Sequence, residues 1–209
     1  MHIKICGLTR KEDVDFCSHL GINALGFILA DSPRSIEIER VAEITRGITP
    51  LITKVAVVMN PSKELLERVV NSGIFECIQF HGEEDPELIS NNPLKSIKAI
   101  SIDIENNTGL EKINKYKDVD CFLFDSKIGK NRGGIGSSFN WDILNNIEVS
   151  KPYILAGGLG PDNIYEALSK HNFHGIDLNS KLEIKAGIKD HNLIKESVRI
   201  IRDFQLCQF

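Results

Sequence analysis

The stretch KVAVVMNPSKELLERVVNSGIFECIQFH, residues 54–81, carries the pattern that decides the fold. Residues 54–59 form a short apolar run that is typical of a buried strand. Asn60-Pro61 then opens a segment, 62–71, whose apolar residues recur with helical spacing. A second strand pattern follows at 76–81. Because two strands joined through a helix run parallel, this stretch predicts one βαβ unit.

The same alternation runs through the whole chain, with strand patterns beginning roughly every 20–32 residues. Eight strands are predicted, at residues 2–6, 24–29, 54–59, 76–81, 96–102, 121–126, 152–157 and 175–180. Helices are predicted at 10–20, 36–48, 62–71, 162–171 and after Asp190. Eight evenly spaced units predict an α/β fold, a single (β/α)8 TIM barrel of nearly minimal size over residues 1–209. An open doubly wound sheet is the alternative, which the even spacing disfavours.

The composition excludes several classes of protein. Of 209 residues, 42% are hydrophobic and 26% charged, and the formal net charge of −4 argues against a nucleic-acid partner. No apolar run approaches the roughly 18–20 residues of a membrane span, and the first residues leave no room for a signal peptide. The five cysteines are scattered, which fits neither a disulfide framework nor structural zinc. We therefore expect a reducing compartment, the cytoplasm.

A barrel of this kind places its active site at the carboxyl ends of the strands. Cys6 ends the first predicted strand, is followed by Gly7 and shares a face with Lys4. It is either a buried structural cysteine or a reactive thiol. Arg34 lies in the second loop, 30–35, and is either a solvated surface charge or a guanidinium aimed at a planar carboxylate.

Two further candidates end the fourth and sixth strands. His81 shares a face with Gln79 and is either a structural imidazole or a site residue. Asp125 is followed by a polar loop, 127–139, that contains Gly129, Gly133, Gly134 and Gly136. A carboxyl group at the apolar rim of a barrel can be kept protonated by poor solvation, as a general acid requires.

The last two strands end in turns that are suited to an anion. Gly157-Gly158 follows the seventh strand and Asn179-Ser180 follows the eighth, where barrels usually bind phosphate. Glycines let backbone N–H groups approach an anion. Neither glycine cluster has the spacing of a dinucleotide fingerprint or a P-loop, which argues against NAD and ATP. These turns predict a sugar-phosphate site.

Taken together, the motifs resemble those of the phosphoribosylanthranilate isomerases of tryptophan biosynthesis, over nearly the whole chain. The matching stretches are KICGLT at 4–9, SPR at 32–34, QFHG at 79–82, DS at 125–126, GGIG at 133–136, FNW at 139–141, LAGGL at 155–159 and GID at 175–177.

This resemblance implies an Amadori rearrangement of N-(5-phosphoribosyl)anthranilate without cofactor or metal. It makes Cys6 the general base at sugar C2′ and Asp125 the general acid at the furanose ring oxygen. Arg34 would hold the anthranilate carboxylate, and His81 is counted among the substrate-binding residues. Gly157, Gly158, Asn179 and Ser180 would bind the phosphate in their turns.

One expectation comes from the residues alone: Lys4, which faces inward, pairs with Asp177 of the last strand and favours the Cys6 thiolate. The chain departs from the family pattern at two positions. Ile135 stands where threonine is usual, and Lys181 where the family has glycine. A glycine there would supply an unusual backbone angle, whereas a lysine would add positive charge to the phosphate site.

Two other functions compete with the isomerase. One is another sugar-phosphate enzyme on a similar barrel, and the other is a non-catalytic barrel that binds anionic metabolites. A metal-dependent epimerase would need several inward His and Asp ligands, which His81 alone does not provide. A sensor would be expected to have lost Cys6 or Asp125. The expected partner is a small sugar phosphate, and the expected state a monomer, with a homodimer through the loops as the alternative.

Overall fold

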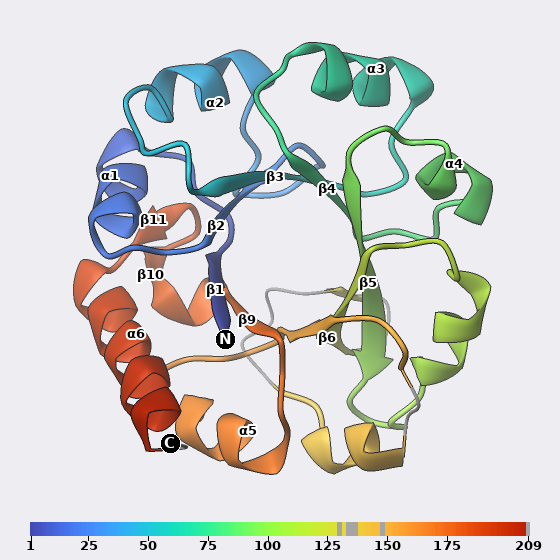
Figure 1. The fold of residues 1–209 in the computed structure, drawn as a ribbon, viewed down its shortest axis with the longest axis vertical. Helices are drawn as coiled ribbons and strands as arrows, with labels where there is room; N and C mark the ends of the chain where they lie inside the picture. The colour runs from blue at the N-terminus through green and yellow to red at the C-terminus, as the bar shows by residue number, and fades with distance from the viewer. Residues whose placement is uncertain (129–130, 133–137, 147–148, 208–209) are drawn as a thin grey trace.

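Eight parallel strands close into a barrel. The computed structural model describes residues 1–128, 131–132, 138–146 and 149–207. Within them the strands follow the order β5-β4-β3-β2-β1-β9-β8-β6, and a β5–β6 pairing closes the ring (Figure 1). The barrel strands are β1 His2–Ile5, β2 Ala24–Ile28, β3 Thr53–Val58, β4 Cys77–Phe80, β5 Lys95–Asp103, β6 Cys121–Ile128, β8 Tyr153–Leu155 and β9 Gly175–Leu178. The predicted barrel is confirmed.

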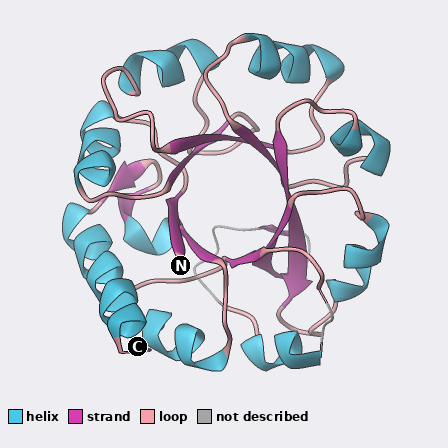
Figure 2. Ribbon diagram, in the orientation of Figure 1, coloured by secondary structure: helices cyan, strands magenta, loops and turns pink. Residues whose placement is uncertain are grey.

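Helices form the outer layer around this ring (Figure 2). The α-helices are α1 Lys11–His19, α2 Ile38–Ile44, α3 Lys63–Asn71, α4 Pro86–Ser90, α5 Ile164–Lys170 and α6 His191–Leu206. Three of them follow a residue whose side chain caps the helix: Ser62 accepts from the N–H of Leu65, Asp85 from that of Glu87, and Asp190 from those of Asn192 and Leu193.

The crossovers after β5 and β6 contain 3-10 helices rather than α-helices, namely η1 Leu110–Lys115 and η2 Trp141–Asn146. In the first of these crossovers the chain leaves β5 through a turn in which Asn107 and Gly109 have φ of 53° and 127°. A side chain on Gly109 would meet the carbonyl oxygen of Ser101.

Strand alternation divides the core into two layers. Ile3 and Ile5 face outward into the large apolar layer between sheet and helices. Cys6 faces the barrel interior, where it packs with Val57 and Ala99 in a smaller cluster. The interior is partly polar at its carboxyl end, and this is where the predicted site residues gather.

Short elements follow β6 and β9 at that end, and among them only β7, Asn131–Arg132, joins the barrel sheet. This two-residue strand pairs with the end of β6. After β9 the chain forms η3, Ser180–Leu182, and then an antiparallel hairpin of β10, Glu183–Lys185, and β11, Ile188–Lys189. Figure 1 shows this hairpin at the rim of the barrel, between α1 and α6.

Candidate active site

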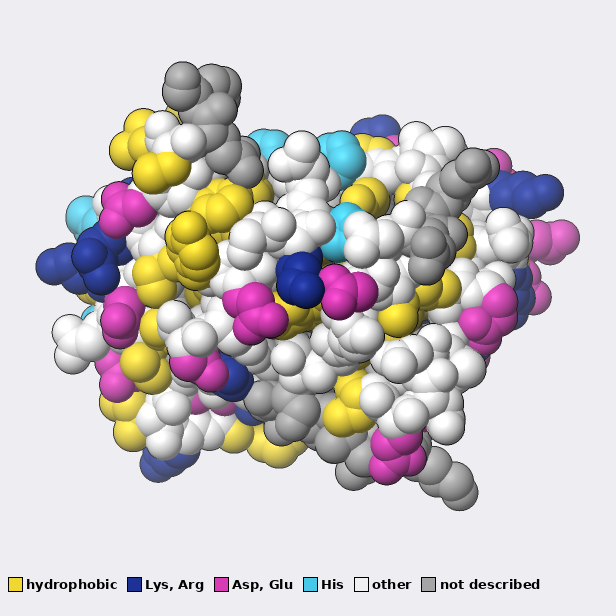
Figure 3. Space-filling model, turned by 90° about the horizontal axis from the view of Figure 1, so that it is seen from below, with side chains coloured by type: hydrophobic (Ala, Val, Ile, Leu, Met, Phe, Trp, Pro, Cys, Tyr) yellow, Lys and Arg dark blue, Asp and Glu magenta, His cyan; other side chains and the backbone are white. Residues whose placement is uncertain are grey.

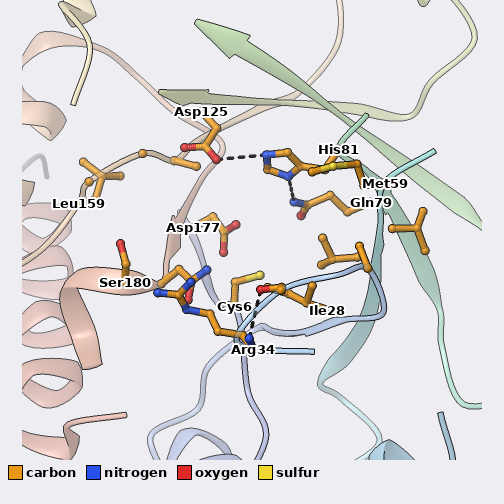
Figure 4. Close-up of a pocket in the computed structure, with 18 of the residues that line it drawn as sticks. Cys6, Ile28, Arg34, Met59, Gln79, His81, Asp125, Leu159, Asp177 and Ser180 are labelled. Carbon is orange, nitrogen blue, oxygen red and sulfur yellow. Dashed lines mark hydrogen bonds and ion pairs between the residues drawn. The ribbon is translucent and has the colours of Figure 1, made fainter. Parts of the chain in front are cut away.

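A pocket opens at the carboxyl ends of the strands and brings together all eight predicted site residues. It is lined by Cys6, Ile28, Ala30, Asp31, Ser32, Arg34, Val57, Val58, Met59, Gln79, His81, Asp125, Ala156, Gly157, Gly158, Leu159, Asp177, Asn179 and Ser180. Figure 4 shows Asp177 near the centre, with Asp125 on one side and Cys6 on the other. The predicted glycine-rich loop with Gly129, Gly133, Gly134, Ile135 and Gly136 lies outside the described residues.

Cys6 and His81 each directly follow a strand, and backbone hydrogen bonds hold both residues in place. Cys6 donates its backbone N–H to Leu178 at 2.9 Å, and His81 donates to Val58 at 2.8 Å. Each of these residues therefore continues the hydrogen bonding of its strand, which fixes the direction of its side chain.

Cys6 lies against Gly26, and a side chain on Gly26 would approach the Cys6 Sγ to 2.7 Å and the Lys4 Nζ to 3.0 Å. The absence of a side chain there gives both groups their space. Burial raises the pKa of the Cys6 thiol, while the ammonium groups of Lys4 and Lys189 lower it in part. The thiol is therefore the major form at neutral pH, and the two lysines favour the thiolate.

The predicted pair of Lys4 with Asp177 is present inside the barrel. Lys4 Nζ lies 2.9 Å from Asp177 Oδ2, and the two side chains are 3% and 7% exposed. Burial alone would lower the pKa of Lys4, but the attraction of Asp177 and Cys6 outweighs it and raises that pKa. Asp177 Oδ1 has no hydrogen-bond partner among the described residues. The sequence indicated the pairing of Asp177 but not its position in the pocket.

His81 links two polar residues on the other side of the pocket (Figure 4). Its Nε2 lies 3.2 Å from Asp125 Oδ2, and its Nδ1 lies 3.1 Å from Gln79 Nε2. Because the amide nitrogen of Gln79 is a donor, Nδ1 is the acceptor and the ring proton on Nε2 faces Asp125. Asp125 Oδ1 accepts from the N–H of Ser126 at 2.8 Å. The surroundings of Asp125 are thus more polar than the apolar rim that the sequence predicted.

Arg34 lies near Cys6, and one edge of its guanidinium binds a carboxylate of the protein itself. Its Nε and Nη2 donate to Glu183 at 2.8–3.0 Å. The sequence did not indicate Glu183, because 149 residues separate it from Arg34.

The glycine turn after β8 offers backbone donors. Gly157 and Gly158 have φ of 88° and 61°, a region that favours glycine. Asn163 holds the turn by accepting from Gly160 N–H and donating to Gly158 O, both at 2.9 Å. Among the described residues, no hydrogen bond is formed by the N–H groups of Gly157, Gly158 or Ser180. Helix α5 begins only at Ile164, later than predicted.

Lys181 does not supply a free charge to this turn. Its Nζ lies 2.6 Å from Asp162 Oδ2, while its stem covers Gly160. Among the described residues, the non-glycine residues with positive φ are Asn60 and Asn107, so the backbone of Lys181 does not need the conformation of a glycine.

The described residues hold neither a metal-binding cluster nor a membrane-spanning helix. They contain no group of three or more His, Cys, Asp or Glu side chains placed to hold a metal ion. No helix among them is long and apolar enough to cross a membrane.

Comparisons with known proteins agree with one another. The model of the N-(5'phosphoribosyl)anthranilate isomerase family matches residues 3–199. An N-(5'-phosphoribosyl)anthranilate isomerase of Petrotoga mobilis is 49% identical over 207 residues, with 99% of each chain covered.

Two solved structures have the same fold. One is a phosphoribosyl anthranilate isomerase in complex with reduced 1-(o-carboxyphenylamino)-1-deoxyribulose 5-phosphate, with 27% identity, a TM-score of 0.83 and coverage of 97% of this chain and 99% of the other. The other describes monomers generated from the dimeric enzyme of Thermotoga maritima, with 28% identity, a TM-score of 0.84 and coverage of 97% and 99%.

Proposed function

The chain belongs to the N-(5'-phosphoribosyl)anthranilate isomerase family, and from this membership we propose how its pocket carries out the reaction. The protein is an isomerase of tryptophan biosynthesis that converts N-(5'-phosphoribosyl)anthranilate to 1-(2-carboxyphenylamino)-1-deoxyribulose 5-phosphate. The observation that carries the proposal is the placement of Cys6 and Asp125 in one pocket, between a guanidinium and a turn whose N–H groups form no hydrogen bond with the described part of the chain.

Asp125 acts first, as the general acid. It donates a proton to the furanose ring oxygen, the C1′–O bond breaks, and the anthranilate nitrogen forms a C1′=N bond. Cys6, as the thiolate, then removes the proton from C2′, and the electron pair moves through C1′ to the nitrogen. The resulting enolamine tautomerises: its hydroxyl proton is lost, C2′ becomes the ketone and C1′ gains a proton. Atoms and electrons balance without a cofactor.

The two charged ends of the substrate bind on opposite sides of these residues. Arg34 binds the anthranilate carboxylate, since its guanidinium lines the pocket beside Cys6. Gly157 and Gly158 in the turn after β8, and Ser180 after β9, bind the phosphate through backbone N–H groups. Asn179 belongs to the same turn as Ser180. Asp177 Oδ1, a buried oxygen without a partner among the residues that the structure describes, accepts from a sugar hydroxyl. His81 holds Asp125 in place.

The chain works as a cytoplasmic monomer in this proposal. Among the described residues, the large exposed apolar side chains belong to five different segments of the chain, at Leu51, Met59, Tyr165, Ile184 and Leu206. Figure 3 shows a face on which acidic and basic side chains alternate, which does not favour a nucleic-acid partner. Analytical ultracentrifugation at micromolar protein would show one 23.4 kDa species, and a species of twice that mass would contradict the proposal.

Turnover by a pair of cysteine variants tests the proposal. Purified protein is given N-(5'-phosphoribosyl)anthranilate, and the loss of substrate fluorescence is followed, with and without EDTA. We expect turnover that EDTA leaves unchanged. Cys6→Ala should lose at least about a thousandfold in kcat, whereas Cys17→Ala, a variant of an equally buried cysteine on α1, should keep its kcat. Equal turnover by the two variants would refute the role of Cys6.

A further inference from the structure

A buried ionic network lies beside the pocket, and two of its members, Glu183 and Lys189, take no part in the steps above. Glu183 is the first residue of β10. Both of its carboxylate oxygens bind Arg34, with Nε at 2.9 and 3.0 Å and Nη2 at 2.8 Å. The Glu183 side chain is 3% exposed and that of Arg34 is 15% exposed. A charge-assisted contact of this kind fixes the plane of the guanidinium.

Glu183 has a second cationic partner on β11. Lys189 Nζ lies 2.9 Å from Glu183 Oε1 and 2.9 Å from Asn179 Oδ1, and it also donates to the Asn179 carbonyl at 3.1 Å. The Lys189 side chain is fully buried. Burial alone would raise the pKa of Glu183, but the contacts with Arg34 and Lys189 lower it. Glu183 is therefore a carboxylate at neutral pH.

The network leaves one edge of the guanidinium open. Nε and Nη2 are bound to Glu183, whereas Nη1 has no partner among the described residues. The arginine stem lies close against Gly7, where an added side chain would meet Arg34 Cδ at 2.8 Å and Asn179 Oδ1 at 2.7 Å. Arg34 thus presents its Nη1–Nη2 edge to the pocket, and two parallel N–H groups suit a carboxylate.

We propose that Glu183 is a positioning residue that holds one edge of Arg34, directs the other edge into the pocket and so makes the site select ligands that carry a carboxylate. Lys189 connects the Glu183–Arg34 ion pair to Asn179 on the phosphate side of the pocket. The proposal rests on the role of Arg34 given above, because a fixed guanidinium has this consequence only if it binds the substrate.

The proposed role of Glu183 is tested by calorimetric titration with two ligands that differ in one group. The first is reduced 1-(o-carboxyphenylamino)-1-deoxyribulose 5-phosphate, and the second is the same compound without the carboxylate. Glu183→Gln keeps the shape of the side chain and removes its charge. We expect it to bind the first ligand about tenfold to a hundredfold more weakly and the second within about threefold. The substrate KM should rise with the first ligand's Kd, while kcat stays within about threefold.

Two further variants serve as controls. Glu76→Gln removes an exposed glutamate that pairs with Lys54, and it should change neither affinity. Glu183→Gln leaves Lys189 buried with one partner fewer, which threatens folding. The double variant Glu183→Gln/Lys189→Met removes both buried charges, and the selective loss should persist in it.

Equal losses for both ligands would show that Glu183 is merely structural. Tighter binding of the carboxylate ligand by Glu183→Gln would show that Glu183 competes with the substrate for Arg34. Both results would overturn the proposal. Arg34→Met distinguishes a failure of the role of Glu183 from a failure of the role of Arg34. If it loses affinity selectively and Glu183→Gln does not, the inference on Glu183 is wrong. If Arg34→Met shows no selective loss, the role of Arg34 itself is wrong.

Discussion

Gly157 is the glycine whose replacement should damage the site most directly. Its φ is 88°, and a side chain there would lie 2.5 Å from Ser126 Oγ, 2.6 Å from Ser126 N and 2.9 Å from Asp125 Oδ1. Gly47 is a matched control, because its φ is 85° and nothing lies within 4 Å of a side chain added there. The two alanine variants therefore share the backbone strain and differ in the collision.

The magnitudes follow from these contacts. Backbone strain at positive φ costs about 1–2 kcal/mol in both variants. Crowding adds about 1–3 kcal/mol in Gly157→Ala only. At about 2–4 °C per kcal/mol for a chain of this size, Gly47→Ala should lower Tm by about 2–8 °C and Gly157→Ala by about 4–20 °C. A collision with Asp125 also displaces the acid, and a shift of about 1 Å costs on the order of a hundredfold in kcat.

Differential scanning calorimetry and the fluorescence assay measure the two effects. Gly157→Ala should lose both stability and turnover, whereas Gly47→Ala should lose stability alone. If both variants unfold at the same temperature and turn over at the wild-type rate, Gly157 does not support Asp125 and the reasoning from these distances is wrong.

Three other outcomes are expected. Lys4→Met leaves Asp177 buried without its partner, which should lower the free energy of unfolding by about 3–5 kcal/mol in chemical denaturation. The pH midpoint of Cys6 alkylation should also rise, because Lys4 favours the thiolate. Unchanged stability together with an unchanged midpoint would refute both roles of Lys4. The contacts of Asp13 with Arg10 lower its pKa although it is buried, so its stabilisation is present above the unfolded pKa of about 3.9 and is lost as the pH falls through the folded value. The Tm gap between wild type and Asp13→Asn should accordingly close below about pH 4, and a gap that stays constant to pH 2 would contradict this. Lys181→Gly should change KM less than about threefold, because Asp162 already binds the ammonium; a strongly improved KM would mark the lysine as a defect.

The barrel could be predicted because the patterns that mark each strand and helix lie within a few neighbouring residues of the sequence. Short apolar runs and helical spacing mark the strands within a few residues, as at β3 and β4. The pairing of Lys4 with Asp177 could be predicted as well. Closure makes β1 and β9 neighbours, and in their register Lys4 stands opposite Asp177.

The remaining features depend on contacts that are distant in the sequence. Glu183 and Lys189 lie on a short hairpin that the strand patterns did not mark. Glu183 binds Arg34, from which 149 residues separate it, and Lys189 binds Glu183 and Asn179. The position of Lys181 near the phosphate turns could be predicted from the sequence. Its pairing with Asp162 could not, because that contact depends on how two loops lie against each other. No helix was predicted after β5 or β6, because the 3-10 helices there, η1 and η2, have six residues each and are too short to show a helical apolar spacing.

The central claim is that Cys6 and Asp125 act as one catalytic unit, and a double-mutant cycle tests it most directly. kcat/KM is measured for wild type, Cys6→Ala, Asp125→Ala and the double variant, with the Kd of the reduced product analogue as a check on the pocket. Each single variant should lose at least about a thousandfold, the double variant should be little worse than either, and the analogue should bind all four within about tenfold. Turnover that survives in both single variants, with the analogue still bound, would contradict the account.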